Sequence, residues 1–190
     1  MAKITAKGKK SLTISWGEVD RADGYDIFFA RCKHGKKKPA MKKIGTIQGS
    51  KDLKWTKKGL KGKTAYKAKV RAYVMKGGKK EYISTSPLVH AYTSGSTKHY
   101  TNAKSVTVRE RSVSLKEGQT YKIKAKVNKL KKGKRLMQKG HAARLRYKSS
   151  NPDVAKVNRS GKITAKSKGI CYVYVYAVNG AYKKVKVVIK

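Results

Sequence analysis

Residues 145–169 constrain the fold more than any other part of the sequence. Asn151-Pro152-Asp153 is a turn signal, because proline fixes φ and the flanking side chains can hydrogen-bond their own backbone. A second turn signal ends at Gly161, a residue type that adopts positive φ without strain. The residues that follow alternate between apolar and polar, which is the period of a half-buried strand. Two reversals this close together predict a β-meander in an all-β domain.

The same stretch resembles the bacterial immunoglobulin-like domain of group 2. The shared features are an aromatic residue, a Ser-Ser-Asn-Pro turn, a Val-Ala-x-Val strand, a Ser-Gly-Lys-Ile-Thr-Ala strand and a later glycine. In this sequence they are Tyr147, 149–152, 154–157, 160–165 and Gly169. The opening of the family pattern is similar to residues 113–120 (VSLKEGQT). The resemblance implies a β-sandwich, which we place at residues 105–190.

Three further features of this second domain are readable. Residues 121–127 alternate strictly and predict one strand. Residues 170–178 predict another strand, in which the tyrosines at 172, 174 and 176 face away from the apolar residues between them. Asn179-Gly180 is the dipeptide most typical of a two-residue hairpin turn. Residues 128–144 depart from the family pattern as a longer, very basic loop.

The first half of the chain, residues 1–93, predicts a sandwich of its own. Alternation and turn signals give seven short strands, at 3–6, 11–16, 24–31, 41–47, 53–56, 66–74 and 80–93. Their order resembles the fibronectin type III domain. The residues that carry this resemblance are Trp16, Ala-Asp-Gly-Tyr at 22–25, Leu60, Gly62, Tyr66, Val70, Ala72, Ser86, Pro87, Val89 and Thr93. It implies a tyrosine corner made by Tyr66. Residues 94–104 lack periodicity and are expected to be a linker.

Charge is the outlying feature of the composition, with 50 basic and 9 acidic residues and a net charge of +41. A field of that sign attracts polyanions such as nucleic acid, wall teichoic acid, sulfated glycans or acidic lipid surfaces. Only nine of the basic residues are arginines. Because bidentate recognition of bases and phosphates favours arginine, the lysine excess indicates diffuse attraction or plain solvation.

The basic loop is the sharpest candidate site, because loops on rigid scaffolds often carry function. Its candidate polyanion-binding residues are Lys129, Lys131, Lys132, Lys134, Arg135, Lys139, Arg144 and Arg146. The alternative is a loop that is only solvated. Outward basic residues at 67, 69, 71, 122, 124, 126, 184 and 186 lie near outward tyrosines. They predict either a platform for glycans or polyanions, or lysine stems that merely cover the rings.

Catalytic chemistry is not expected. The sequence has no nucleophile elbow, phosphate-binding glycine loop or zinc-ligand spacing, so we expect no catalytic residue, no cofactor and no metal. The histidines are dispersed and expected to be solvated: His34, His90, His99 and His141. Cys32 and Cys171 are expected to be buried, inert thiols in different domains. Four acidic residues, at 18, 20, 23 and 26, lie close together in the sequence. They predict either a calcium site or local charge balance against the surrounding lysines.

Resemblance to both families implies a non-catalytic module of a bacterial cell-surface or secreted protein, expected to be Gram-positive. We expect an adhesive stalk or spacer whose partner is an anionic cell-wall polymer or a host or mucus glycan. No apolar run approaches the ~18 residues of a membrane span, and no signal peptide opens the chain, so a monomeric fragment of a longer extracellular chain is expected. The alternatives are an accessory module of a secreted polysaccharide- or peptidoglycan-degrading enzyme, and a nucleic-acid-binding protein, which the lysine excess disfavours.

Overall fold

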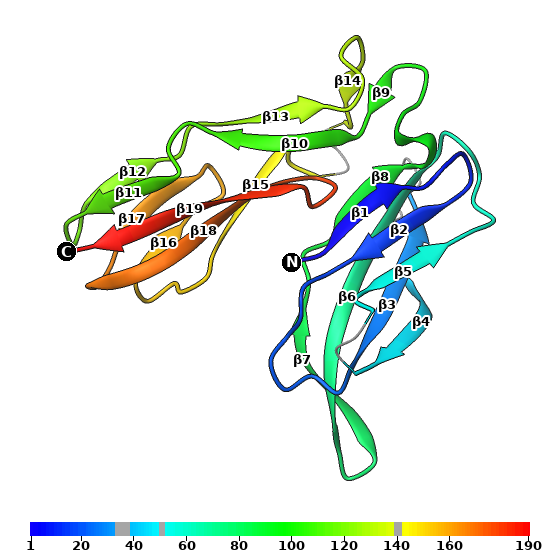
Figure 1. Ribbon diagram of the computed structural model, residues 1–190, viewed down its shortest axis with the longest axis horizontal. Coiled ribbons are helices and arrows are strands. Elements are labelled where there is room, and N and C mark those ends of the chain that lie inside the picture. The colour runs from blue at the N-terminus through cyan, green and yellow to red at the C-terminus, as the bar shows by residue number, and fades with distance from the viewer. Residues whose placement is uncertain (33–38, 50–51, 139–141) are drawn as a thin grey trace. The chain divides into compact units, whose positions relative to one another are not determined.

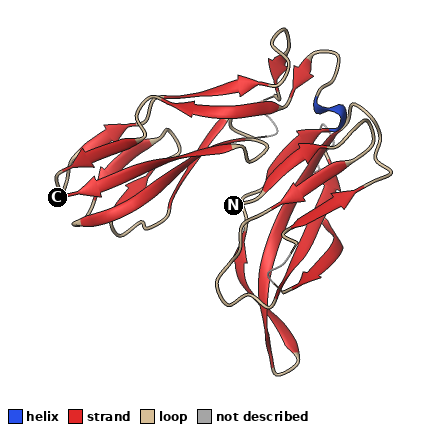
Figure 2. Ribbon diagram, in the orientation of Figure 1, coloured by secondary structure: helices blue, strands red, loops and turns tan. Residues whose placement is uncertain are grey.

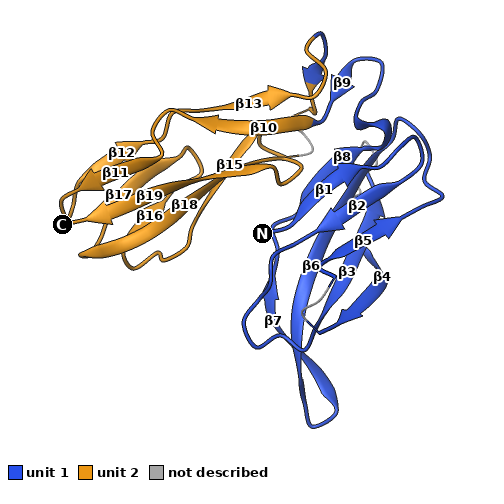
Figure 3. Cartoon of the chain, in the orientation of Figure 1, with its two compact units in different colours: residues 1–102, 133–135 blue, residues 103–132, 136–190 orange. Residues whose placement is uncertain are grey.

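The structure is a computed structural model that describes residues 1–32, 39–49, 52–138 and 142–190. In these ranges all elements are strands except one 3-10 turn, η1 (Thr93–Gly95) (Figure 2). The chain divides into two compact units, residues 1–102 with 133–135, and residues 103–132 with 136–190 (Figure 3). Each unit has its own hydrophobic core. The predicted class, all-β with two immunoglobulin-like β-sandwiches in tandem, is confirmed.

The first unit packs two antiparallel sheets against each other (Figure 1). Its strands are β1 (Lys3–Ala6), β2 (Leu12–Ser15), β3 (Gly24–Arg31), β4 (Lys42–Gln48), β5 (Lys54–Lys57), β6 (Ala65–Lys76), β7 (Lys79–Thr85) and β8 (Val89–Tyr92). One sheet has the order β1-β2-β5. The other has the order β4-β3-β6-β7, with β8 also paired to β6.

Alternation along these strands turns one row of side chains into the core, because successive Cβ atoms point to opposite faces. Leu12, Ile14 and Ile27 are fully buried. The hydroxyl of Tyr66 accepts a hydrogen bond from the backbone N–H of Lys61 at 3.0 Å. This contact confirms the tyrosine corner, which ties the loop before β6 to the strand itself.

The expectation of a single strand at residues 80–93 is wrong. The strand is interrupted between β7 and β8, because Pro87 has no N–H to donate to the ladder. At the break, the N–H of Ser86 donates to the carbonyl of Val70 at 2.8 Å. The Ser86 hydroxyl accepts a hydrogen bond from the Val70 N–H at 3.0 Å. The serine therefore replaces the lost ladder bonds, and both strands stay antiparallel to β6.

Residues 94–104, expected to be a linker, hold part of η1, then β9 (Tyr100–Thr101) and the start of β10 (Ala103–Val108). β9 pairs with β14 (Arg135–Leu136) from the basic loop. The backbone N–H of Arg135 donates to the carbonyl of His99 at 3.0 Å. This pairing explains why residues 133–135 are grouped with the first unit.

In the part of the chain that the structure describes, the second unit has nine strands besides the short β14. They are β10, β11 (Ser112–Leu115), β12 (Thr120–Lys122), β13 (Ala125–Lys129), β15 (Leu145–Ser149), β16 (Ala155–Val157), β17 (Lys162–Ala165), β18 (Gly169–Ala177) and β19 (Tyr182–Ile189). The sheets have the orders β11-β19-β18-β15, β12-β17-β16 and β10-β13. Within these three sheets, the described strands pair antiparallel except β11 with β19, which run parallel.

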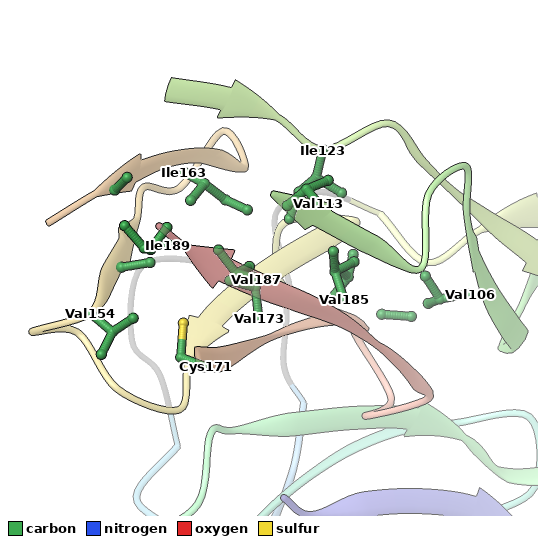
Figure 4. Packing of buried hydrophobic residues seen from close by; sticks show 14 of the residues in the cluster. Val106, Val113, Ile123, Val154, Ile163, Cys171, Val173, Val185, Val187 and Ile189 are labelled. Carbon is green, nitrogen blue, oxygen red and sulfur yellow. The ribbon is translucent and has the colours of Figure 1, made fainter. Parts of the chain in front are cut away.

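β-branched residues from all three sheets dominate the core of the second unit (Figure 4). Val173, Val175 and Val187 are fully buried, and Cys171 is 2% exposed. The predicted hairpin at Asn179-Gly180 is confirmed, although residues 178–180 form a three-residue loop instead of a two-residue turn. The N–H of Ala177 donates to the carbonyl of Ala181 at 2.8 Å, and Gly180 adopts a φ of 82°.

The expectation of one strand at residues 121–127 is wrong, although the predicted inward face is correct. β12 pairs with β17, whereas β13 pairs with β10. Between these strands, the N–H of Ile123 donates to the backbone carbonyl of Gly161 at 3.0 Å. The backbone N–H of Arg109 donates to the carbonyl of Lys124 at 2.9 Å. The backbone therefore changes sheets at these two residues while Ile123 stays 5% exposed.

The expected meander at residues 145–169 is also corrected. β16 and β17 form a hairpin, but β15 pairs with β18 in the other sheet. The first turn is therefore a crossing between sheets rather than a hairpin. In the second turn, the Asn158 carboxamide oxygen accepts hydrogen bonds from the N–H groups of Ser160 and Lys162, both at 3.0 Å. Gly161 follows with a φ of 82°.

Candidate functional site: two cation–aromatic sheet faces

The outer face of β3, β6 and β7 in the first unit is built around a buried carboxylate. Asp26 is fully buried although it alternates with core residues. Its Oδ1 accepts hydrogen bonds from the Thr46 hydroxyl at 2.6 Å and the Lys80 ammonium at 2.9 Å. Its Oδ2 accepts one from the Tyr82 hydroxyl at 2.7 Å. The carboxylate is thus paired and hydrogen-bonded, as a buried charge must be.

These partners decide the charge state of Asp26. Burial by itself raises the pKa of its carboxyl, but hydrogen bonds from Thr46, Tyr82 and Lys80 outweigh burial and hold the pKa below its ordinary value. Burial lowers the pKa of Lys80, and the contact with Asp26 more than compensates, so the net pKa is raised. The hydrogen bond to Asp26 also raises the pKa of Tyr82. The network therefore keeps an ion pair in place at neutral pH.

Cations on this face cover the rings beside them. The Arg71 guanidinium lies 3.4 Å from the centre of the Tyr82 ring, and the Lys80 ammonium lies 3.9 Å from the centre of the Tyr73 ring. Tyr73 also packs on Gly24, where a Cβ would lie 2.5 Å from its hydroxyl, and it is only 3% exposed. On the outer face of the first unit, the cationic side chains of Arg71 and Lys80 therefore pack against tyrosine rings of the same face.

The outer face of the β15-β18-β19 sheet in the second unit differs. We call it the tyrosine–lysine face and define it as Lys148, Ile170, Tyr172, Tyr174, Tyr182, Lys184 and Lys186. Cross-strand register sets Tyr174 between Lys148 and Lys184, and Tyr172 opposite Lys186. Lysines and tyrosines thus alternate across the strands as well as along them.

Aromatic and aliphatic surface remains open on the tyrosine–lysine face. Tyr172 is 40% exposed, Tyr182 is 44% exposed and Ile170 is 56% exposed. The Lys184 ammonium lies 5.4 Å from the Tyr172 ring centre and 5.7 Å from the Tyr174 ring centre, farther than the closest cations of the first unit. No acidic residue occurs in β15, β18 or β19. The lysines here have no carboxylate neighbour within their own strands.

Arg146, in β15, covers the ring of Tyr176 at one end of this sheet. Its guanidinium lies 4.7 Å from the Tyr176 ring centre and donates to the carbonyls of Ala177 at 3.3 Å and Val178 at 3.1 Å. Tyr176 is 6% exposed as a result. Burial lowers the pKa of Arg146 and raises that of Tyr176. Arg146 therefore lies in β15 and not in the basic loop, where it was expected from the sequence.

The other candidate residues of the basic loop are spread over different environments. Lys129 ends β13, while Lys131, Lys132, Arg135 and Arg144 are exposed. The ammonium of Lys134 donates to the carbonyl of Thr97 at 2.6 Å. Lys139 lies outside the described residues. The structure therefore does not gather the eight residues into one cluster, and their role in polyanion binding stays a prediction.

The remaining chemistry-bearing residues do not converge in the described ranges. No group of three or more His, Cys, Asp or Glu side chains there could hold a metal ion. In the acidic stretch, Asp26 faces Lys80, and Asp23 accepts from the N–H of Met75 at 2.6 Å. His90 was expected to be solvated; instead it is 4% exposed, because every residue of β8 is buried.

The two thiols lie in different units, as expected, and both are free. Cys171 is buried beside Ser149, and burial raises its pKa. Cys32 is only partly buried, but burial still raises its pKa to about 11. The raised pKa values keep both thiols protonated at neutral pH, and this limits their reactivity. His34 and His141 lie outside the described residues.

Sequence reasoning found part of the tyrosine–lysine face and missed the rest. Outward positions for Tyr172, Tyr174, Lys184 and Lys186 were predicted and are confirmed. Tyr182 was not singled out. The signal for it was available in the alternation of the last strand, because Val185 and Val187 face inward and Tyr182 falls on the opposite face. The Asp26 network had no local signal, because its partners come from three other positions in the chain.

Solved fibronectin type III domains match about half of the chain: one from human contactin 1 (16% identity, 48% of this chain, 72% of that one, TM-score 0.39) and the FN5 domain of Drosophila Lar (22%, 49%, 90%, 0.38). A third, from human fibronectin type III domain containing protein 3, has 25% identity over 48% of this chain and 80% of that one, with a TM-score of 0.34.

No curated protein matches the chain. Within the described residues, no helix has the length and apolar character that crossing a membrane requires. Bacterial Ig-like and fibronectin type III domains are generally non-catalytic, and they are typical of extracellular or surface proteins. Residues 102–188 match the family model of the bacterial Ig-like domain (group 2), which confirms the resemblance first read from the turns around Asn151 and Gly161.

Proposed function

We propose that this chain is a non-catalytic extracellular module, a stalk or spacer on a bacterial surface, whose second unit binds an anionic wall polymer or an acidic glycan. The observation that carries the proposal is the tyrosine–lysine face. It combines exposed tyrosine rings with lysines on strands that contain no acidic residue. The matching face of the first unit supports the contrast, because its cations already lie over its own rings.

The proposed mechanism follows from the two residue types. Lysine ammonium groups attract anionic oxygens as point charges, without the fixed geometry that arginine imposes. Exposed tyrosine rings offer flat apolar area with a polar tip, which suits the faces of sugar rings. Attraction of this kind tolerates repeat polymers of varied detail and weakens as salt rises, because exposed charges are screened.

The first experiment compares two triple variants with the same change in charge. One carries Lys148→Gln, Lys184→Gln and Lys186→Gln on the tyrosine–lysine face. Its control carries the same change at exposed lysines elsewhere in the second unit, at 156, 166 and 168. We expect the first variant to elute from immobilised teichoic acid or heparin at clearly lower NaCl than the control. Equal elution of the two would refute a specific role for this face.

The basic loop is a second contributor to test. Charge reversal of Lys131, Lys132, Lys134 and Arg135 should weaken retention on the same columns more than reversal of four lysines in strands. Because Lys134 also donates to Thr97, a melting curve should accompany this variant. A loop variant that folds normally and loses no more than the strand variant would show that the loop is not special.

Two rival functions remain testable. A nucleic-acid-binding protein would prefer DNA over teichoic acid in direct competition, whereas the wall-polymer proposal expects the reverse. An accessory module of a polysaccharide- or peptidoglycan-degrading enzyme would share a reading frame with a catalytic domain. The complete reading frame separates that rival from a stalk.

A further inference from the structure

A cavity of about 430 Å³ lies in the second unit, beside strands that have no neighbour on one side. β15 is the last strand of the β11-β19-β18-β15 sheet, and β16 is the last strand of the β12-β17-β16 sheet. The described residues that line the cavity are Ala143, Leu145, Arg146, Tyr147, Val157, Asn158, Arg159 and Tyr176. The volume falls in the range of roughly 300–1,000 Å³ that is usual for small-ligand sites.

The polar groups in this lining are cationic or neutral donors. Two are guanidinium groups, and none of the lining residues is acidic. Hydrogen bonds to the carbonyls of Ala177 and Val178 hold Arg146 in place, together with its contact to the Tyr176 ring. Arg159 is exposed and forms no ion pair with the described part of the chain. The guanidinium of Arg146 is therefore held in place by the fold, whereas the guanidinium of Arg159 is exposed and can bind a ligand.

The Asn158 side chain adds a neutral donor. Its Oδ1 is committed to the turn, where it accepts from the N–H groups of Ser160 and Lys162 and from the Ser160 hydroxyl. Its amide nitrogen forms no hydrogen bond within the described ranges. Carboxamide and guanidinium donors together are suited to oxygen-rich anionic groups, which guanidinium groups bind in a bidentate manner.

The opposite part of the lining is aromatic and aliphatic. The Tyr147 ring packs directly on Gly161, where a Cβ would lie 2.5 Å from the ring. Leu145 and Val157 are both half-buried beside the core. Rings and aliphatic carbons of this kind accommodate the body of a ligand, while the few polar groups fix its orientation.

We propose that this cavity binds a small ligand with one anionic group, carboxylate, phosphate or sulfate, attached to a sugar-sized body. Arg159, Arg146 and Asn158 receive the anionic group, and Tyr147 and the aliphatic residues contact the body. The site differs from the tyrosine–lysine face because it is a cavity that holds one unit, not a surface along which a polymer lies. The inference does not depend on the proposed function.

The test uses the full chain and four sugars: glucuronate, glucose 6-phosphate, glucose 6-sulfate and neutral glucose. Ligand-detected NMR gives the affinity of each. We expect one or more of the anionic sugars to bind, and glucose to bind at least about tenfold more weakly. Arg159→Gln should weaken binding of the anionic sugar about tenfold or more. Arg111→Gln, which removes the same charge from an exposed position outside the cavity, should leave the affinity unchanged.

Several results would overturn the proposal. They are saturation by none of the anionic sugars, equal affinity for glucose, or equal losses in the two arginine variants. Inorganic phosphate that binds as tightly as glucose 6-phosphate would eliminate the role of the sugar body. The triple lysine variant of the tyrosine–lysine face should keep the affinity for the small anionic sugar, so failure of one proposal does not imply failure of the other.

Discussion

Replacing Asp26 by asparagine tests the buried network of the first unit. The substitution keeps the size of the side chain and removes the charge that three donors share: the Thr46 and Tyr82 hydroxyls and the Lys80 ammonium. Hydrogen bonds to a charged group contribute about 1.5–3 kcal/mol each. Asparagine keeps one acceptor oxygen, and the Lys80 side chain, 31% exposed, can turn to water. We therefore expect a loss of about 2–3 kcal/mol in the free energy of unfolding at pH 7.

The loss should depend on pH in a defined direction. The pKa of Asp26 is lowered from 3.8 by folding. A carboxyl whose folded pKa is depressed stabilises the protein above its unfolded pKa and loses this contribution as the pH falls through the folded value. The difference between the natural protein and Asp26→Asn should thus be full at pH 5–7. It should shrink below about pH 4 and vanish once the carboxyl is protonated.

Tryptophan fluorescence isolates the unit concerned, because both tryptophans, Trp16 and Trp55, lie in the first unit. For a domain of this size, the expected loss corresponds to a fall in Tm of roughly 10–20 °C. Asp20→Asn is the matched control, because that side chain is 93% exposed and should change stability by less than about 0.5 kcal/mol. Equal effects of the two substitutions, or a pH-independent difference for Asp26→Asn, would refute the reasoning.

Three further predictions test the turns and the thiol. Gly161→Ala should cost about 1–3 kcal/mol more than Gly118→Ala in urea unfolding followed by circular dichroism. Both glycines have positive φ, but only at Gly161 would the new Cβ meet the Tyr147 ring; equal costs would contradict the packing. Tyr66→Phe should lose about 1 kcal/mol by tryptophan fluorescence, because the corner hydrogen bond is removed, and an unchanged melt would argue against the corner. Cys32, with a pKa of about 11, should react with a thiol reagent at a rate that still rises steeply above about pH 10; a rate that is half-maximal near about pH 8.5 and level by about pH 10, as in the unfolded chain, would contradict its burial.

Local pattern was enough to predict where most strands lie and which way their side chains face. The run from Gly24 to Arg31 was predicted with its observed bounds, and the hairpin at Asn179-Gly180 was predicted at its observed place with a loop one residue too short. Turn residues act through their own backbone, so their effect needs no knowledge of the rest of the chain. The tyrosine corner followed from the resemblance to the fibronectin type III domain, and its hydrogen bond joins residues only five positions apart, Lys61 and Tyr66.

Local pattern could not decide which strand pairs with which. Residues 121–127 alternate without a break, yet the chain changes sheets at residues 123 and 124. The N–H of Ile123 bonds to the carbonyl of Gly161, whereas the carbonyl of the next residue bonds to the N–H of Arg109. The parallel pairing of β11 with β19 joins the two ends of the second unit. Alternation has the same period whichever neighbour a strand takes, so the choice depends on partners that are distant in sequence.

The sequence by itself determined two all-β domains, an outward row of tyrosines and lysines, and a chain of strong positive charge. The tertiary structure alone decided which of those outward residues remain exposed. Tyr73 and Tyr176 are covered by Lys80 and Arg146, whereas Tyr172 is left open. The physical reason is that the exposure of a side chain depends on what packs over it, and those covering residues come from other strands of the sheet.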